Sequence, residues 1–151
     1  MAVNERFDFS GRSVVITGGG KGIGKVYAEE FAKVGARVVA ADIDAVAAEN
    51  VAAALRQSGF EALGLGVDIA SEEAAKAMVQ ATLERFGSLD VLINNASLMS
   101  VLPRRSWLEI PVEEWDRVMA VNLRGMFLCC RAVAPSSREM RRGRTETCRA
   151  D

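Results

Sequence analysis

A glycine-rich segment, Thr17-Gly18-Gly19-Gly20-Lys21-Gly22-Ile23-Gly24, is the part of the sequence whose residue types and spacing point most directly to chemistry. An apolar run precedes it and a helical pattern of apolar residues follows it, so we expect the segment at a strand-to-helix junction. Glycines at such a junction allow a tight turn, a close approach of backbone to phosphate and close packing of helix on strand. The first N–H groups of the helix then bind an anion. The segment predicts a site for a dinucleotide pyrophosphate.

Asp42 closes the next predicted strand, 18 residues after Gly24. A carboxylate at this position can accept hydrogen bonds from both hydroxyls of an adenosine ribose, whereas it would repel a 2′-phosphate by about 1 to 4 kcal/mol. Lys21 acts in the opposite direction, but an exposed ammonium contributes little beside a fixed carboxylate. NAD is therefore the predicted cofactor and NADP the less favoured one, with Ile43 as a further cofactor contact. The simpler alternatives are a turn residue for Asp42 and a solvated charge for Lys21.

A competing interpretation comes from Gly19–Lys25, which fits the phosphate loop G-x-x-x-x-G-K of nucleotide hydrolases up to the next position. Val26 stands there in place of the hydroxyl residue that binds magnesium. The ribose-binding carboxylate at Asp42 also has no role in a hydrolase site. The hydrolase alternative is therefore disfavoured.

Composition excludes several other classes of function. Histidine is absent, which rules out Ser-His and Cys-His nucleophile pairs and imidazole-ligated zinc. The cysteines Cys129, Cys130 and Cys148 suit neither a disulfide framework nor a metal site, so no metal is predicted. Lys plus Arg total 19 and Asp plus Glu total 20, so no strong field would attract nucleic acid. No apolar run approaches the roughly 20 residues of a membrane span, and no signal peptide is recognised, so we expect a cytoplasmic location without membrane partners.

Strands and helices alternate along the sequence. Strands are expected at Ser13–Ile16, Arg37–Ala41, Ala62–Val67 and Val91–Ile93, and helices from Gly24 onward, over Ala45–Gln57, from the N-cap Ser71 to about Phe86, and over about Val112–Val133. Strict alternation with apolar strands predicts an α/β fold with a parallel sheet covered on both faces. Right-handed crossovers favour a doubly wound Rossmann-type sheet with strand order 3-2-1-4. The ligand crevice is then expected between the ends of the first and fourth strands.

With these motifs in order, the sequence resembles the short-chain dehydrogenase/reductase family from about Phe9 to Gly143. The glycine-rich segment looks like the cofactor loop of that family. Asp68-Ile69 is similar to its adenine-contacting acidic position, and Asn94-Asn95-Ala96 is similar to its signature after the fourth strand. Trp115–Phe127 is similar to the next helix of the family.

The resemblance implies hydride transfer between a nicotinamide cofactor and an alcohol or carbonyl substrate. It also implies that Asn122 holds a water of a proton relay, that Asn94 braces the fourth strand and that Thr17 fastens the cofactor loop. From the residues alone, Asn122 is equally well read as a buried amide that bonds a neighbouring carbonyl.

The family's reaction also needs a tyrosine, a lysine four residues later and a preceding serine, and none of these follows Asn122. The only tyrosine is Tyr27, and the residue four positions later is Phe31. We therefore expect residues 1–143 to be the cofactor-binding half of such an enzyme, inactive alone, and residues 144–151 to be a tail without family character. A shifted reading frame or early stop is one hypothesis for that tail. The alternatives are a non-catalytic dinucleotide-binding module and a fragment that does not fold stably.

The predicted sheet leaves Val91–Ile93 at an edge, with unpaired backbone groups on an apolar segment. The following helix would expose Trp115, Met119 and Phe127 in a monomer. We therefore expect a homo-oligomer or a self-associating chain, and expect a lysine at Leu92 to reduce pairing at that edge.

Overall fold

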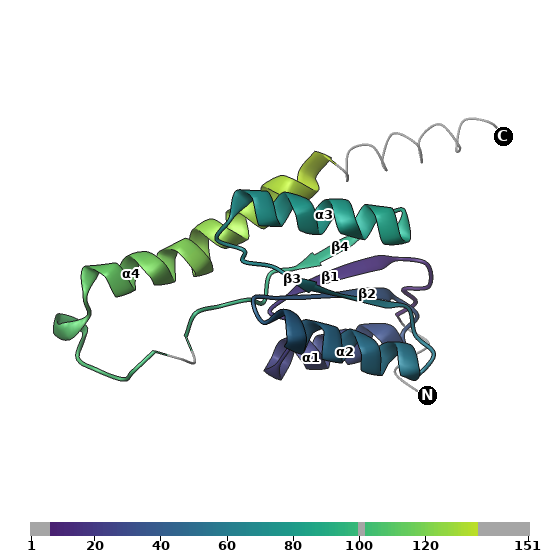
Figure 1. Cartoon of the computed structure of the whole chain (residues 1–151), viewed down its shortest axis with the longest axis horizontal. Helices are drawn as coiled ribbons and strands as arrows, with labels where there is room; N and C mark the ends of the chain where they lie inside the picture. Colours follow the sequence, from purple (N-terminus) through teal and green to yellow (C-terminus); the bar gives the residue numbers. More distant parts are fainter. Residues whose placement is uncertain (1–6, 100–101, 136–151) are drawn as a thin grey trace.

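The computed structural model describes residues 7–99 and 102–135, and the predicted tail 144–151 lies outside them. Within these residues, four parallel strands form one sheet in the order β3-β2-β1-β4. In chain order they are β1 (Ser13–Thr17), β2 (Arg37–Asp42), β3 (Ala62–Gly66) and β4 (Val91–Ile93). Helices α1 (Gly22–Lys33) and α2 (Ala45–Gln57) cover one face; α3 (Glu72–Phe86) and the helix that begins with α4 (Val112–Met119) lie on the other (Figure 1). The predicted α/β Rossmann-type fold and strand order 3-2-1-4 are confirmed.

Side chains of β1 alternate between two hydrophobic clusters, one on each face of the sheet. Val15 packs with Met78 of α3, whereas Val14 and Ile16 belong to the cluster that includes Leu55 of α2. All three β1 side chains are fully buried. Burial on both faces explains why this strand reads as an uninterrupted apolar run rather than an alternating one.

The ends of the elements differ from the sequence-based expectation by one or two residues. β1 extends to Thr17, and α1 begins at Gly22, two residues before the predicted start. Gly22 has a φ of 53°, so the left-handed turn ends there and the helix begins at once. The expected N-cap of α3 is confirmed, because the Ser71 hydroxyl accepts a hydrogen bond from the Ala74 N–H at 3.2 Å.

The last predicted helix is less regular than expected. A short 3₁₀ turn, Trp107–Glu109, precedes α4, and a π-helical segment, Ala120–Gly125, follows it before regular helix resumes over 126–135. A Cβ on Gly125 would lie 2.9 Å from the Ile69 side chain, so this glycine lets the helix approach the end of β3 closely. Wide π turns of this kind occur frequently at functional sites.

Among the residues that the structure describes, one helix, Val112–Pro135, is long and apolar enough to cross a membrane by length and composition. We expected no such segment from the sequence; the helix meets these criteria although it contains Arg124 and Arg131. Core helices of soluble proteins meet the same criteria. The Arg124 guanidinium donates to the Ala70 carbonyl at 3.2 Å, and Arg131 forms an ion pair with Glu72. These contacts attach the helix to the rest of its own domain.

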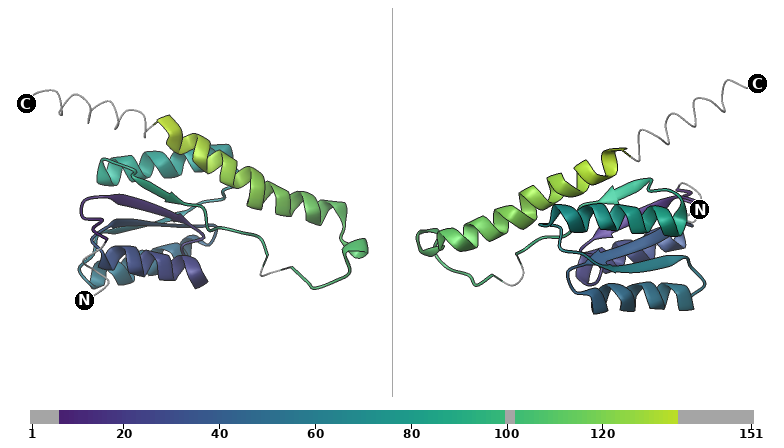
Figure 2. Two further views of the ribbon diagram at one scale, coloured as in Figure 1. Left: turned by 180° about the vertical axis from the view of Figure 1, so that it is seen from behind. Right: turned by 45° about the horizontal axis from the view of Figure 1, so that its top comes forward.

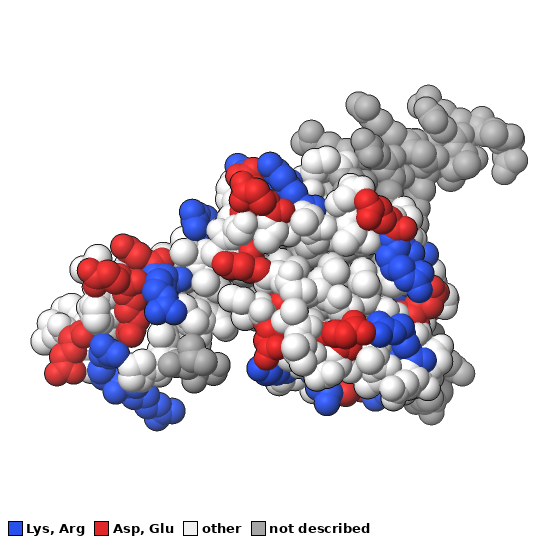
Figure 3. Space-filling model, viewed as in Figure 1, with Lys and Arg blue, Asp and Glu red and all other residues white. Residues whose placement is uncertain are grey.

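The same helix projects beyond the sheet at its α4 end, while its 126–135 part lies along α3 (Figure 2). Trp115, Leu123 and Phe127 on it are 57%, 58% and 58% exposed. Charges of both signs are interspersed over the face of the molecule in Figure 3, without a large area of one sign. The exposed apolar residues of this helix are therefore the clearest candidates for self-association.

We expect the chain to self-associate as its concentration rises, and expect Leu123→Glu with Phe127→Glu to shift it toward monomer, because a charge in an apolar contact must be desolvated. Sedimentation velocity over a concentration series measures this shift. The matched control is Val46→Glu on α2, at a side chain that is 70% exposed. A chain that stays monomeric at high concentration, or an equal effect of Val46→Glu, would contradict this assignment.

The lysine expected to act at Leu92 is a poorer test than the helix variants. The Leu92 side chain packs against the hydrophobic cluster on the α3 side of the sheet. A lysine there would lose apolar packing as well as block the edge, so stability and association would change together.

Candidate functional site

The glycine-rich loop is so tightly packed that a Cβ on any of four of its glycines, Gly18, Gly19, Gly20 and Gly24, would lie within 3.0 Å of a neighbouring atom. A Cβ on Gly24 would lie 1.9 Å from the Gly18 carbonyl oxygen and 2.7 Å from the Asn95 amide nitrogen. A Cβ on Gly18, whose φ is 65°, would lie 2.9 Å from the Cα of Ala96. The loop therefore folds against the segment that follows β4, as predicted from the positions of these residues at the strand ends.

Thr17 and Asn95 join the ends of β1 and β4. The Thr17 hydroxyl donates to the Ile93 carbonyl at 3.2 Å and accepts from the N–H groups of Asn95 and Ala96, both at 3.1 Å. The Asn95 amide donates to the carbonyls of Thr17 and Gly18 at 3.0 and 3.1 Å. These bonds hold the two loops at the point where the strand order reverses, which is where ligands bind in such sheets.

The start of α1 can hold an anion. Its N-cap residue, Lys21, makes no side-chain cap and the first turn contains no acidic residue. By contrast, Asp44 caps α2 and Ser71 caps α3. The first N–H groups of α1 are therefore left without a capping side chain, which fits the phosphate that the glycine loop predicts. Ile23 is 67% exposed beside them.

The Asp42 carboxylate lies beside this loop. It accepts from the Gly20 N–H through Oδ2 and from the Asp44 N–H through Oδ1, both at 3.0 Å. Each carboxylate oxygen has a second lone pair, so the group can still accept hydrogen bonds from ribose hydroxyls. Ile43 is 77% exposed, so its side chain is accessible to a ligand, as its predicted role in cofactor contact requires.

Asp68 and Ile69, the second and third residues after β3, have different environments. Asp68 is exposed, and its carboxylate accepts from the Ala70 N–H at 2.9 Å. The Ile69 side chain is only 5% exposed and packs beneath Gly125. Asp68 can reach a ligand through its side chain, whereas Ile69 can do so only through its backbone.

Asn122 lies in the π-helical segment, and its Oδ1 accepts from the Leu98 N–H at 2.7 Å. This bond differs from the predicted alternative, in which its amide bonds a carbonyl. The Asn94 amide donates to Cys130 Sγ at 3.3 Å, while its buried Oδ1 has no partner among the described residues. The adjacent cysteines were expected to be small core residues. Cys129 is fully buried, and burial raises the pKa of its thiol to about 11, so the thiol is unreactive. For Cys130 the expectation is wrong, because this residue is exposed.

Tyr27 lies on α1 and is 40% exposed, which agrees with its predicted role as a packing or surface residue. Asp44 was not selected from the sequence, yet it contacts both Asp42 and Lys21. Its position just before a predicted helix is the signal of an N-cap and says nothing of its second partner. In the described part of the chain, no group of three or more potential ligands could hold a metal.

Comparisons with known proteins show the family to which the chain belongs. The sequence matches the short chain dehydrogenase family over residues 12–145. It is 44% identical over 124 residues to an uncharacterized oxidoreductase of Thermotoga maritima, which covers 82% of this chain and 47% of the relative. It is 34% identical over 133 residues to a D-threitol dehydrogenase of Mycolicibacterium smegmatis, covering 88% and 50%.

The fold also matches a crystal structure of 3-ketoacyl-(acyl-carrier-protein) reductase from Brucella melitensis complexed with NADH. The TM-score is 0.80 at 37% identity, covering 85% of this chain and 51% of that chain. The chain spans about half the length of the curated relatives that it matches. Because the family match includes both the glycine-rich loop and the segment after β4, the chain belongs to the short-chain dehydrogenase/reductase family of oxidoreductases.

Proposed function

We propose that this chain carries the dinucleotide-binding half of an oxidoreductase that moves a hydride between a nicotinamide cofactor and an alcohol or carbonyl carbon. The close packing of Gly24 against Gly18 and Asn95 carries this proposal, because the glycines have no Cβ groups beside the uncapped start of α1. Glycines without Cβ groups at this turn let a pyrophosphate approach the helix N-terminus closely. The NADH-bound reductase of the same fold supports the proposal.

We further propose that the cofactor is NAD rather than NADP. Asp42 supports this choice, because its carboxylate is fixed by two backbone N–H groups and would face the adenosine ribose. The nicotinamide ring, when bound, supplies the hydride donor or acceptor. Thr17 and Asn95 hold the glycine loop that binds and orients the dinucleotide, and Asn122 orients the loop at Leu98. A cytoplasmic location is part of the same proposal and rests on composition alone.

The test is an affinity comparison on the full 151-residue chain. We expect NAD to bind more tightly than NADP, and expect Asp42→Ala to weaken NAD binding by about tenfold or more, because charged hydrogen bonds to the ribose are lost. NADP binding should change little, because removing the repulsion of its 2′-phosphate offsets the hydrogen bond that is lost. Isothermal titration calorimetry gives both dissociation constants.

The matched control is Asp42→Asn, which keeps one acceptor oxygen and removes the charge. This variant should lose part of the preference for NAD. Its one side-chain oxygen can keep one of the two hydrogen bonds from the N–H groups of Gly20 and Asp44. Equal affinity for NAD and NADP before and after both substitutions would overturn the cofactor proposal.

A further inference from the structure

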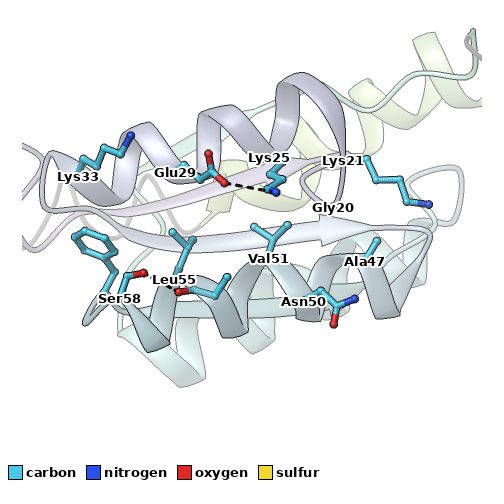
Figure 4. Close-up of a pocket in the computed structure, with 12 residues that line it drawn as sticks. Gly20, Lys21, Lys25, Glu29, Lys33, Ala47, Asn50, Val51, Leu55 and Ser58 are labelled. Atoms are coloured by element: carbon cyan, nitrogen blue, oxygen red, sulfur yellow. Dashed lines mark hydrogen bonds and ion pairs between the residues drawn. The ribbon is translucent and has the colours of Figure 1, made fainter.

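Lys21 is the only cation within the loop Thr17–Gly24, and its ammonium is held in an ion pair. Its Nζ donates to Asp44 Oδ2 at 2.7 Å. In Figure 4, the Lys21 side chain runs away from Lys25 toward the start of α2, at the end of a crevice of about 410 Å³ between α1 and α2. The ion pair therefore joins the glycine loop to the helix that follows Asp42.

Asp44 is itself held in place by the backbone. Its Oδ1 accepts from the Ala47 N–H at 3.0 Å, which caps α2, and its own N–H donates to Asp42 Oδ1 at 3.0 Å. The carboxylate is thus oriented independently of Lys21. The hydrogen bond between them raises the pKa of Lys21 and lowers the pKa of Asp44, so both groups are charged near neutral pH.

Other ion pairs on α1 differ from this one. Lys25 pairs with Glu29 at 3.8 Å and Lys33 pairs with Glu30 at 2.7 Å, each within the same helix. The Lys21–Asp44 pair instead connects two elements, beside the carboxylate that would meet the ribose. Together with Asp42, the pair comprises two carboxylates and one ammonium, so these three groups carry a net negative charge.

We propose that Asp44 is a specificity-determining residue, which favours NAD by binding the Lys21 ammonium that could otherwise neutralise the 2′-phosphate of NADP. This inference rests on the proposed dinucleotide site and extends it from Asp42 to a second carboxylate. Asp44 acts in two ways: it competes with the phosphate for Lys21, and it adds a negative charge close to the phosphate.

The expected effect is moderate, because the pair is exposed to solvent, with side-chain exposures of 71% for Lys21 and 42% for Asp44. Exposed charges interact weakly and are screened by salt. We therefore expect Asp44→Asn to tighten NADP binding by about three- to tenfold at low ionic strength, and by less at high salt. NAD binding should change by less than about twofold, since NAD has no phosphate at that position.

The experiment uses calorimetric titration of the 151-residue chain with NAD and with NADP. Asparagine is as good an N-cap as aspartate, so Asp44→Asn removes the charge and keeps the cap of α2. Asp44→Ser is the second variant, because serine caps as well and is also neutral. Glu30→Gln is the matched control: it breaks another 2.7 Å ion pair of α1, away from the loop, and should leave both affinities unchanged.

Lys21→Met completes a double-mutant cycle. If Asp44 holds Lys21 away from the phosphate, Lys21→Met weakens NADP binding by several-fold in the Asp44→Asn background and by less than about twofold in the unaltered chain. Equal losses in the two backgrounds would overturn the inference, as would an equal gain in NAD and NADP affinity on Asp44→Asn. In either case the proposed function survives, because NAD still binds. A chain that binds neither dinucleotide would overturn both.

Discussion

A Gly24→Ala chain should bind NAD about a hundredfold or more weakly than the unaltered chain. The added Cβ would lie 1.9 Å from the Gly18 carbonyl oxygen, far inside any contact distance, and the atom that it meets is main chain. Helix propensity alone favours alanine over glycine by up to about 1 kcal/mol, so any loss comes from this contact. Binding requires the original geometry of the loop, and keeping that geometry against an overpacked contact costs about 1 to 3 kcal/mol and sometimes more. A cost of 2.7 kcal/mol in binding free energy corresponds to about a hundredfold in affinity.

Val26→Ala is the control for Gly24→Ala, because it lies on the same helix at a side chain that is 53% exposed. It should bind NAD as the unaltered chain does. Circular dichroism during heating reports whether each variant keeps its sheet, and calorimetry reports affinity. An affinity for NAD within twofold of the original in Gly24→Ala would show that the loop does not hold the cofactor.

The second large effect is an absence of turnover. We expect the purified 151-residue chain to oxidise no alcohol and reduce no ketone above background with either cofactor. Its one tyrosine, Tyr27, lies on α1 and is followed four positions later by Phe31, so no Tyr-x-x-x-Lys pair can move the proton. A positioned acid or base contributes about 10² to 10⁴ in rate, and residues that act as a unit lose nearly everything together.

Absorbance of NADH, followed at high protein concentration with a panel of alcohols and ketones, measures this turnover. Tyr27→Phe should leave NAD affinity unchanged, which separates the tyrosine from the cofactor site. Steady turnover that disappears in Asn122→Ala would contradict the prediction, because it would mean that an acid or base within these residues supports the reaction.

The positions of the strands followed from the sequence because parallel strands buried on both faces leave long apolar runs. Their order followed from the preference for right-handed crossovers between parallel strands. Val14, Val15 and Ile16 form such a run, and each is fully buried. The glycine loop could also be predicted from the sequence, because positions such as Gly18 and Gly24 have no room for a Cβ and require glycine. Local chemistry determines both features, so a single sequence is enough to predict them.

Features that depend on pairs of distant residues were not predictable. The ion pair of Lys21 with Asp44 joins residues 23 positions apart, and neither residue alone signals the other. The π-helical segment arises where Asn122 bonds Leu98 and where Gly125 meets Ile69, which are tertiary contacts. Helical periodicity in the sequence gives no sign of either, so a continuous regular helix was the natural expectation.

The seam between β1 and β4 also determines the order in which the protein can assemble. Ser13 and Val38 pair with Arg37 and Ala62, each 24 positions away, whereas Val14 pairs with Val91, 77 positions away. Closing the longer loop costs about 1 kcal/mol more in chain entropy, so β4 is expected to dock last and to open first. Thr17 accepts hydrogen bonds from Asn95 and Ala96 between these two strands, so the binding site forms only in the final folding step. A dinucleotide bound there would oppose the opening of β4, because it binds only the state in which β4 is docked.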